Sequence, residues 1–525
     1  MADRLKRLRS ILVVVFFTLG SRVLGMVRDM LQTFVLPSAF FDAFDVAFTF
    51  PNLFRRLFGE GALSAAFIPV LKEEMEKGDD ASTRRLINGT ATLLFLVLAA
   101  IIAVCYLVAG GLHGFVPKYK ESGELFRMLY IMLPYILLIC MTALLAGALN
   151  SLGSFGVPAA GPIVLNVCMI LSLLLLVKPT TDVKWLAAAV LVAGAATLAM
   201  QVVALRFKGI PLSPCFDFRQ PQIGKMISLM APVIVGLGVM QINVMFDRII
   251  AYAFVPQDGA NKVLYIGNRL MQLPLGVFGI AIATVVFPEL SACAARKDEE
   301  GFLETLQHGI RLVLFACIPA GIGLIVLGRP IIELLFERGQ FSPDDTLRAF
   351  RVLGLYAVGL WAFSSVHVVT RGFYSQQDTK TPVKCAVALV AVNLILNLIL
   401  VHTPLREAGL ALATSICSIL NLTILSIILR RRMGRMGARG ILASAVKIGI
   451  ATAVMAVGCI LAMRFAPDGS ALASRVIRVL VPMAVGAGLF LVAAVVLKVE
   501  ELRDFASAVL KRRQRTDSVK EEQEA

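Results

Sequence analysis

Long apolar runs separated by short polar turns occupy most of the sequence between residues 10 and 497. A helix that crosses a membrane needs about 20 consecutive, mostly apolar residues. By this measure the pattern predicts an all-α polytopic membrane protein with fourteen transmembrane helices. The predicted spans are residues 10–35, 39–58, 86–112, 124–149, 157–177, 184–205, 226–255, 262–291, 303–327, 347–374, 382–402, 407–429, 441–465 and 474–497.

The first twelve runs form two groups of six, and several residues recur at a nearly constant offset between the groups. Arg28 and Arg248 are 220 residues apart. Three later pairs are each 224 residues apart, namely Arg127 and Arg351, Ser151 and Ser375, and Pro158 and Pro382. Six is an even number, so both groups have the same orientation. The pattern therefore predicts two six-helix lobes related by a pseudo-two-fold axis along the membrane normal.

These groups define the expected domains. They are a first lobe at 1–205, a cytoplasmic linker at 206–225, a second lobe at 226–432, two C-terminal helices at 433–498 and a charged cytoplasmic tail at 499–525.

Composition supports a membrane protein and explains most of the positive charge. Hydrophobic residues make up 58% of the chain and charged residues 16%, against about 25% in soluble domains. The formal net charge of +16 is concentrated at the N-terminus, in the linker, around Arg430 and in the tail. Lys and Arg are enriched in cytoplasmic loops, so both termini are expected to be cytoplasmic, and nucleic acid is not an expected partner. The nine cysteines form no CxxC motif, which gives no support for a metal site.

Some charged residues lie inside the predicted spans and need a different explanation. The first span carries Arg22, Arg28 and Asp29. The other groups lie in the second, seventh and eighth spans and comprise Asp42, Asp45, Asn52, Arg55, Arg56, Glu60, Asp247, Arg248, Asn268, Arg269 and Gln272. An ionised side chain at the membrane centre costs about 2.5–3.5 kcal/mol on insertion scales. We therefore expect these groups to face a wet cavity or to pair with one another.

Helix geometry suggests how these charges are arranged. Arg22 lies near the middle of its span, and the seven-residue spacing puts Asp29 on nearly the same face. Arg28 and Asp29 are expected nearer the outer end and partly buried, and Asp42 and Asp45 are expected near the outer boundary, open to solvent. Pairing of Arg28 with Asp42 or Asp45, and of Arg248 with Asp247, is the structural alternative.

Arginine outnumbers the acids that are available for pairing, which leaves a positive excess. The guanidinium fork donates two parallel hydrogen bonds to phosphate or carboxylate. The residues therefore predict a cationic cavity for an anionic, phosphorylated substrate. No GxxxxGK[ST] loop for ATP and no catalytic triad is visible in the sequence, so an enzyme is not expected and no cofactor is assigned. Coupling to the membrane potential or to a monovalent cation stays open.

Four segments carry a family resemblance: SRVLGMVRD (21–29), DAFDVAFTFPNLFRRLFGEGALSAAFIPVL (42–71), NRLMQLPLGVFGIAIATVVFPELS (268–291) and GFYSQQDTKTPVK (372–384). They resemble the MurJ (MviN) lipid II flippases of the multidrug/oligosaccharidyl-lipid/polysaccharide exporter superfamily. The resemblance implies that the C-terminal helix pair borders a groove for the lipid tail. It also implies alternating-access export of lipid II, the undecaprenyl-pyrophosphate-linked peptidoglycan precursor, across the bacterial inner membrane.

The resemblance also assigns roles to residues of this chain. The family's essential arginines match Arg22, Arg28, Arg55 and Arg269, its functional acid matches Asp42, and Asp29 matches the acidic partner of Arg28. Family members often carry acids where this chain has Asn268 and Gln272, so any coupling role of those acids is in doubt here. The expected gating residues are Asp29, Asp42, Asn52, Arg56, Glu60, Arg248, Asn268 and Gln272.

The implied partners are lipid II and membrane lipids, and cell-wall synthesis proteins remain an open expectation. Pro51 should bend or break the second span, and hinges are expected at Pro51, Pro274 and the glycines at 59, 61, 276 and 279. The principal alternative is a related flippase for lipid-linked oligosaccharide or polysaccharide. An exporter of cationic drugs should carry acids in its cavity, which is opposite to the charge inferred from this chain.

Overall fold

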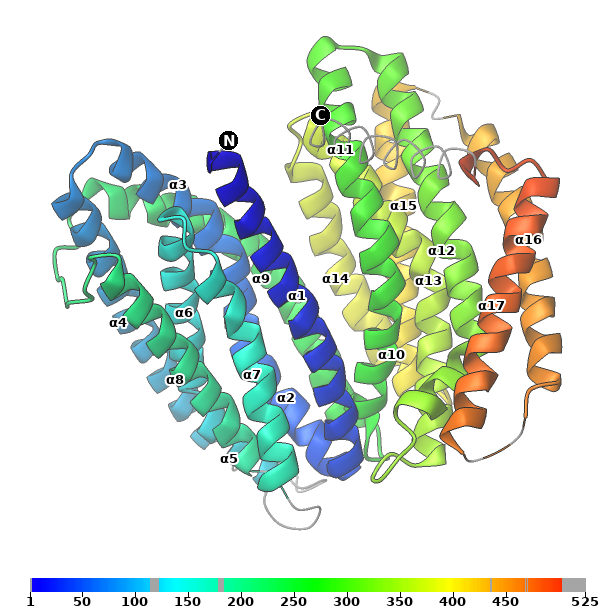
Figure 1. Ribbon diagram of the computed structural model, residues 1–525, viewed down its shortest axis with the longest axis horizontal. Coiled ribbons are helices and arrows are strands. Elements are labelled where there is room, and N and C mark those ends of the chain that lie inside the picture. The colour runs from blue at the N-terminus through cyan, green and yellow to red at the C-terminus, as the bar shows by residue number, and fades with distance from the viewer. Residues whose placement is uncertain are drawn as a thin grey trace. The chain divides into compact units, whose positions relative to one another are not determined.

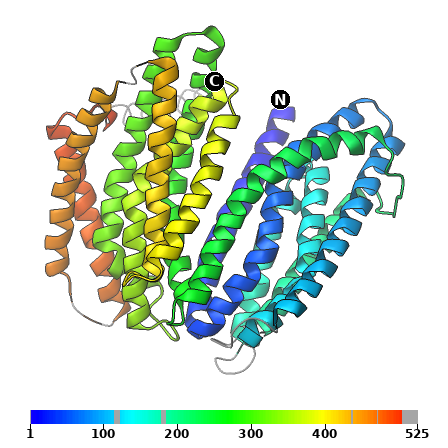
Figure 2. The same ribbon diagram turned by 180° about the vertical axis from the view of Figure 1, so that it is seen from behind.

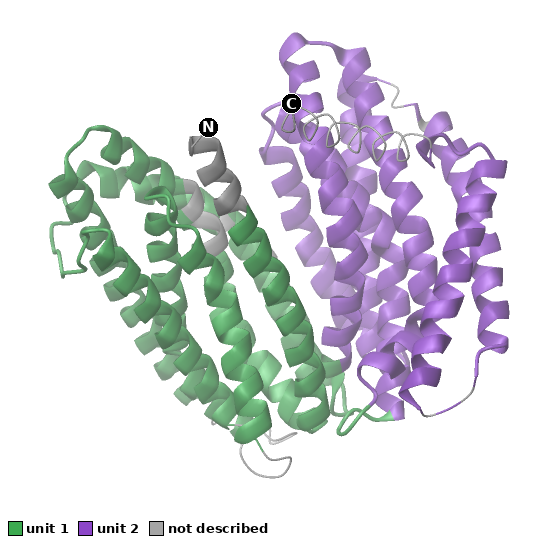
Figure 3. Cartoon of the chain, viewed as in Figure 1, with its two compact units in different colours: residues 1–262, 338–342 green, residues 263–337, 343–525 purple. Residues whose placement is uncertain are grey.

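A computed structural model describes residues 2–113, 122–177, 184–434, 437–467, 469 and 471–502 (Figure 1). These residues are almost entirely helical, and none of them lies in a β-strand. Two compact units make up the chain, residues 1–262 with 338–342, and residues 263–337 with 343–525 (Figure 3). We refer to them as unit 1 and unit 2.

The helices of unit 1 are α1 (Ala2–Val35), α2 (Ser38–Phe54), the π-helix η1 (Arg55–Ala62), α3 (Leu63–Glu76), α4 (Asp80–His113), α5 (Ser122–Met132), α6 (Tyr135–Ser151), α7 (Gly156–Leu175), α8 (Lys184–Phe207) and α9 (Pro221–Phe254). The chain then enters α10 (Ala260–Pro274), whose first three residues still belong to unit 1. Within the unit, α1 packs on α7, while α9 packs on α2, η1 and α3.

The helices of unit 2 are the rest of α10, the π-helix η2 (Leu275–Ile280), α11 (Ala281–Arg296), α12 (Glu299–Leu335), α13 (Pro343–Ser375), α14 (Lys380–Leu400), α15 (Glu407–Met433), α16 (Ala438–Arg464) and α17 (Leu472–Val496). Helix α13 lies between α12 and α15, and the pair α16–α17 packs against α12 (Figure 2).

All fourteen predicted spans fall on helical stretches. Twelve stretches of described residues are long and apolar enough to cross a membrane by length and composition alone. The predicted spans 10–35 and 39–58, on α1 and α2, lie outside those twelve and carry many of the charges singled out above. Large apolar side chains such as Leu107 and Val285, each 77% exposed, point outward, as lipid-facing side chains do. The chain is a multi-pass membrane protein.

Pro51 does not break the second predicted span. Helix α2 continues through Pro51 to Phe54 and then widens into η1 without interruption. Pro274 likewise ends α10, and η2 follows it directly. The two π-helices begin 220 residues apart, which is the offset between Arg28 and Arg248. The four glycines expected at hinges all lie in these π-helices, which often mark functional irregularities in helices.

The boundary between the units differs from the predicted start of the second lobe at residue 226. Helix α9 belongs to unit 1, because polar contacts fix it to the α2–α3 stretch. Lys225 binds Glu73 at 2.6 Å, and Arg56 donates to Gln241 at 3.3 Å. Helix α8 ends at Phe207 and α9 begins at Pro221, so residues 208–220 connect the two helices. The predicted lobes remain an interpretation of the repeat.

Candidate functional site

Arg28 lies in a polar cluster between α1 and α7. Its Nη2 is 2.6 Å from Asp29 Oδ1, and its Nη1 donates to Asn166 Oδ1 at 3.1 Å. Asn166 Nδ2 in turn donates to the Ser21 carbonyl oxygen at 3.1 Å, which orients the amide. The Asp29 carboxylate is fully buried, so the expectation of partial burial is wrong. This ion pair joins Arg28 to its sequence neighbour Asp29 on the same helix.

Arg22 is in a different environment from Asp29, although the two share a helix face by spacing. Arg22 is exposed, whereas Asp29 has no exposed surface. Helical position fixes the direction of a side chain, but its exposure depends on which neighbours cover each turn. Across the described ranges, no hydrogen bond or ion pair involves Arg22, so its guanidinium keeps all its donors for water or a ligand.

Asp42 is buried and serves the N-terminus of another helix. Its Oδ2 accepts from the Gly259 backbone N–H at 2.8 Å, and its Oδ1 accepts from the Lys262 backbone N–H at 2.9 Å. Both groups belong to the start of α10, where unpaired N–H groups favour a negative charge. The prediction that Asp42 is open to solvent is therefore wrong, because α10 begins directly against it.

Arg248 on α9 pairs across helices with Asp45 on α2. Its Nη1 lies 2.9 Å from Asp45 Oδ2, and the two side chains are 16% and 12% exposed. The Arg248 guanidinium also donates to the Asn261 carbonyl at 3.2 Å. Asp45 is therefore not freely solvated, because α2 and α9 pack closely enough for their charges to meet.

The remaining predicted residues of unit 1 lie around η1. Arg55 Nε donates to Asn52 Oδ1 at 2.8 Å, one turn earlier. Arg56 reaches α9 through Gln241. Glu60 lies within η1, and its side chain is outside the described residues.

Asn268, Arg269 and Gln272 form a separate group on α10 in unit 2. Gln272 Nε2 donates to Asn268 Oδ1, so these two amides bind each other along one face of α10. Arg269 is half-buried beside them. The structure thus groups Arg28 with Asp29, Asp42 with the start of α10, Arg248 with Asp45, and Arg55 with Asn52.

Three residues of these clusters were not predicted from the sequence, namely Asn166, Asn261 and Lys262. Asn166 is a single amide in the apolar run 157–177. A lone polar side chain in such a run is the sequence signal that could have identified it as a buried hydrogen-bonding residue. Lys262 begins a predicted span, where a lysine is usually assigned to the interface, yet it is fully buried.

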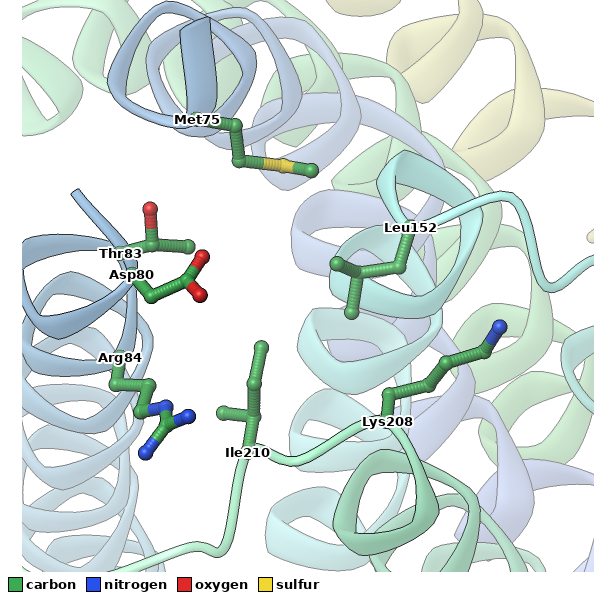
Figure 4. A pocket seen from close by; sticks show the side chains of 7 residues that line it. All are labelled: Met75, Asp80, Thr83, Arg84, Leu152, Lys208 and Ile210. Atoms are coloured by element: carbon green, nitrogen blue, oxygen red, sulfur yellow. The ribbon is translucent and has the colours of Figure 1, made fainter. Parts of the chain in front are cut away.

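A small cavity lies elsewhere in unit 1, where the linker meets α4. Its volume is about 130 Å³, and its lining residues are Met75, Asp80, Thr83, Arg84, Leu152, Lys208 and Ile210 (Figure 4). The lining carries charges of both signs, and none of the predicted site residues contributes to it. No group of three or more metal-ligating side chains occurs among the residues that the structure describes.

Comparison with known proteins identifies the family. The family model described as "Lipid II flippase MurJ" matches residues 36–481. The chain belongs to the MurJ family. The resemblance to the MurJ family is thereby confirmed.

Relatives in this family are similar along most of their length. The "Probable lipid II flippase MurJ" of Vibrio cholerae is 38% identical over 433 residues, which cover 80% of this chain and 82% of the relative. The "Lipid II flippase MurJ" of Burkholderia cenocepacia is 32% identical over 446 residues, covering 81% and 84%. These names describe transporters rather than enzymes.

Solved structures support the fold. One titled "Lipid II flippase MurJ, inward closed conformation" has a TM-score of 0.75 and 24% identity, covering 94% of this chain and all of that chain. An inward-facing multidrug resistance transporter of the MATE family has a TM-score of 0.64 at 13% identity, covering 79% and 95%. At these identities the likeness concerns the fold, and it agrees with the predicted helical membrane architecture.

Proposed function

We propose that this protein moves lipid II from the cytoplasmic to the outer leaflet of the bacterial inner membrane. The observation that carries the proposal is the MurJ family match across residues 36–481. The charges within the helices agree with it, because a pyrophosphate-linked headgroup needs cationic hydrogen-bond donors away from bulk water. On this proposal both termini are cytoplasmic, since the Lys and Arg residues gather in the loops on that side.

The arginines would have different tasks. Arg22, exposed and without a partner in the described ranges, is proposed to contact the pyrophosphate first. Arg28 is held in one orientation by Asp29 and Asn166. Its side chain therefore loses less conformational entropy when it binds the substrate. Arg269 is the proposed contribution of α10, and Arg55 at the start of η1 is proposed to capture the headgroup or gate closure.

Alternating access would require helices that can change shape. The π-helices η1 and η2 contain the proposed hinge glycines, and their irregular hydrogen bonding favours bending there. The energy source is proposed to be the membrane potential or a monovalent cation gradient. One charge that moves through 100 mV gains about 2.3 kcal/mol, enough to reset an empty cationic cavity.

The test combines complementation with a transport assay in vesicles. Arg22→Ala, Arg28→Ala, Arg55→Ala and Arg269→Ala are expected to fail to support growth of a flippase-depleted bacterium at normal protein levels. Arg127→Ala is the matched control, because Arg127 is exposed and, among the residues that the structure describes, forms an ion pair only with Glu124, one turn earlier. Purified protein in vesicles should move lipid II. Preference for a different polyprenyl-linked oligosaccharide, or growth of all four variants, would overturn the proposal.

A further inference from the structure

Residues 338–342, which we call the strap, join α12 to α13 but belong to unit 1. The chain on both sides of the strap belongs to unit 2. Gln340 N–H donates to the Phe34 carbonyl oxygen at 3.0 Å, near the end of α1. Gly339 has φ +58°, and a Cβ there would lie 2.4 Å from the same Phe34 oxygen. The strap therefore lies in close backbone contact with the end of α1.

Lys262 holds the strap from a second direction. Its side chain is fully buried, and its Nζ donates to Ser38 Oγ at 2.8 Å and to the Gln340 carbonyl oxygen at 2.9 Å. The ammonium also lies 5.0 Å from the ring centroid of Phe341, within range of a cation–π interaction. One buried cation thus joins the start of α2 to the strap.

Asp42 fixes the backbone that carries this lysine. Its carboxylate accepts from the N–H groups of Gly259 and Lys262, so the first turn of α10 cannot shift without breaking two charge-assisted hydrogen bonds. A buried ammonium is costly unless it is well hydrogen-bonded. If the strap detached, Lys262 would lose the Gln340 oxygen and the Phe341 ring together, so the strap should attach and detach as a unit.

We propose that Lys262 is a positioning residue that holds the strap against the ends of α1 and α2, and that the strap must detach before the lipid II headgroup is released. This inference rests on the proposed function. Because unit 2 continues from both ends of the strap, any movement of unit 2 during alternating access must pull on it. In the proposed topology the end of α1 faces the outside, where the headgroup leaves.

The first experiment measures the strap without any substrate. Amide hydrogen exchange of the full-length protein in lipid nanodiscs is followed by mass spectrometry for a peptide that covers residues 338–342. Lys262→Met is expected to raise the exchange rate about tenfold or more, because the strap loses its charge-assisted anchor. Lys262→Arg, which keeps a cationic donor, should restore much of the protection.

Lys184→Met is the matched control. Lys184 begins α8 at the same end of unit 1 as the end of α1 and also lies over an aromatic ring, that of Trp185, at 5.7 Å (Figure 1). This variant removes a cation of the same kind without touching the strap, so exchange of residues 338–342 should not change. Equal exchange in Lys262→Met and the unaltered protein, with both folded, would overturn the role of Lys262.

The second experiment tests the link to transport. Phe34→Cys with Gln340→Cys, in a protein whose native cysteines are replaced, allows a short thiol crosslink between the strap and α1. Crosslinking is expected to stop lipid II movement in vesicles, and a cleavable crosslink should restore it on reduction. Full transport with the crosslink intact would overturn the gating role. If the unlinked protein moves no lipid II at all, the proposed function fails, while the exchange result on Lys262 still stands.

Discussion

Arg248 on α9 and Asp45 on α2 form an ion pair, with 2.9 Å between Nη1 and Oδ2. Both side chains are largely buried, so the pair fixes α9 to the first unit rather than to the helices that follow it in sequence. A local interpretation of the sequence would pair Arg248 with its neighbour Asp247, whereas the structure shows a pair with Asp45 on another helix.

Asp45→Asn should destabilise the protein by about 2 kcal/mol, because Arg248 loses a charge-assisted partner in a site with little water. The free energy of unfolding is measured in detergent by reversible denaturation. A double-mutant cycle with Arg248→Gln should give a coupling of about 1–2 kcal/mol. Asp217→Asn, in the exposed linker, is the control and should leave stability unchanged. A coupling near zero would contradict the pair.

Arg28→Lys should impair lipid II transport almost as much as Arg28→Ala. Lysine keeps the charge but lacks the fork that lets Arg28 bind Asp29 and Asn166 at once. We expect a loss of about tenfold or more in the initial rate, which corresponds to about 1.4 kcal/mol. Asn166→Leu should give an intermediate loss, and Arg127→Lys none. Normal transport by Arg28→Lys would show that charge alone suffices at this position.

Glu74→Gln should lower stability at neutral pH but not in strong acid. Hydrogen bonds from Lys77, Ser82 and Gln222 hold the pKa of Glu74 at about 2, below its ordinary value of 4.5. Because the folded-state pKa is lowered, the contribution is complete above pH 4.5 and is lost as the pH falls toward 2. The difference in unfolding free energy between variant and unaltered protein should therefore close across that window.

Glu76→Gln provides the comparison for Glu74, because Glu76 lies only two residues further along α3 and is exposed. Its stability profile should follow that of the unaltered protein at every pH. A Glu74→Gln difference that persists unchanged at pH 2 would rule out the carboxylate as its source.

Glu501→Ala should loosen the C-terminal helix pair far more than Glu500→Ala. Both carboxylates bind Arg311 of α12, but the Glu501 side chain is 1% exposed and that of Glu500 is 72% exposed. Burial acts to raise the pKa of Glu501, but hydrogen bonds, first from Ser444, outweigh it and lower that pKa. We expect a cost of about 3 kcal/mol for Glu501→Ala, as for breaking a buried pair. Thermal unfolding in detergent measures both variants, and equal effects would contradict the difference in burial.

The sequence by itself determined the helices and the two sites of helix irregularity. Apolar runs of membrane-spanning length are a local property, because each backbone polar group in lipid must be satisfied within its own helix. The proline and glycine residues near η1 and η2 act in the same local way on the helix that contains them. The arginines proposed for substrate binding could also be singled out, since a charge inside an apolar run is unusual wherever its side chain finally points.

Only the tertiary structure decided which partner each charge has and how deeply it is buried. Asp42 lies at the edge of its apolar run, yet it is buried because the start of α10 packs directly against its carboxylate. Lys262 holds the strap although 78 residues separate it from Gln340. Such contacts depend on which helices pack side by side and at what height. The pattern of apolar residues carries little information about which helices are neighbours or about their relative height. Every lipid-facing helix has much the same apolar pattern.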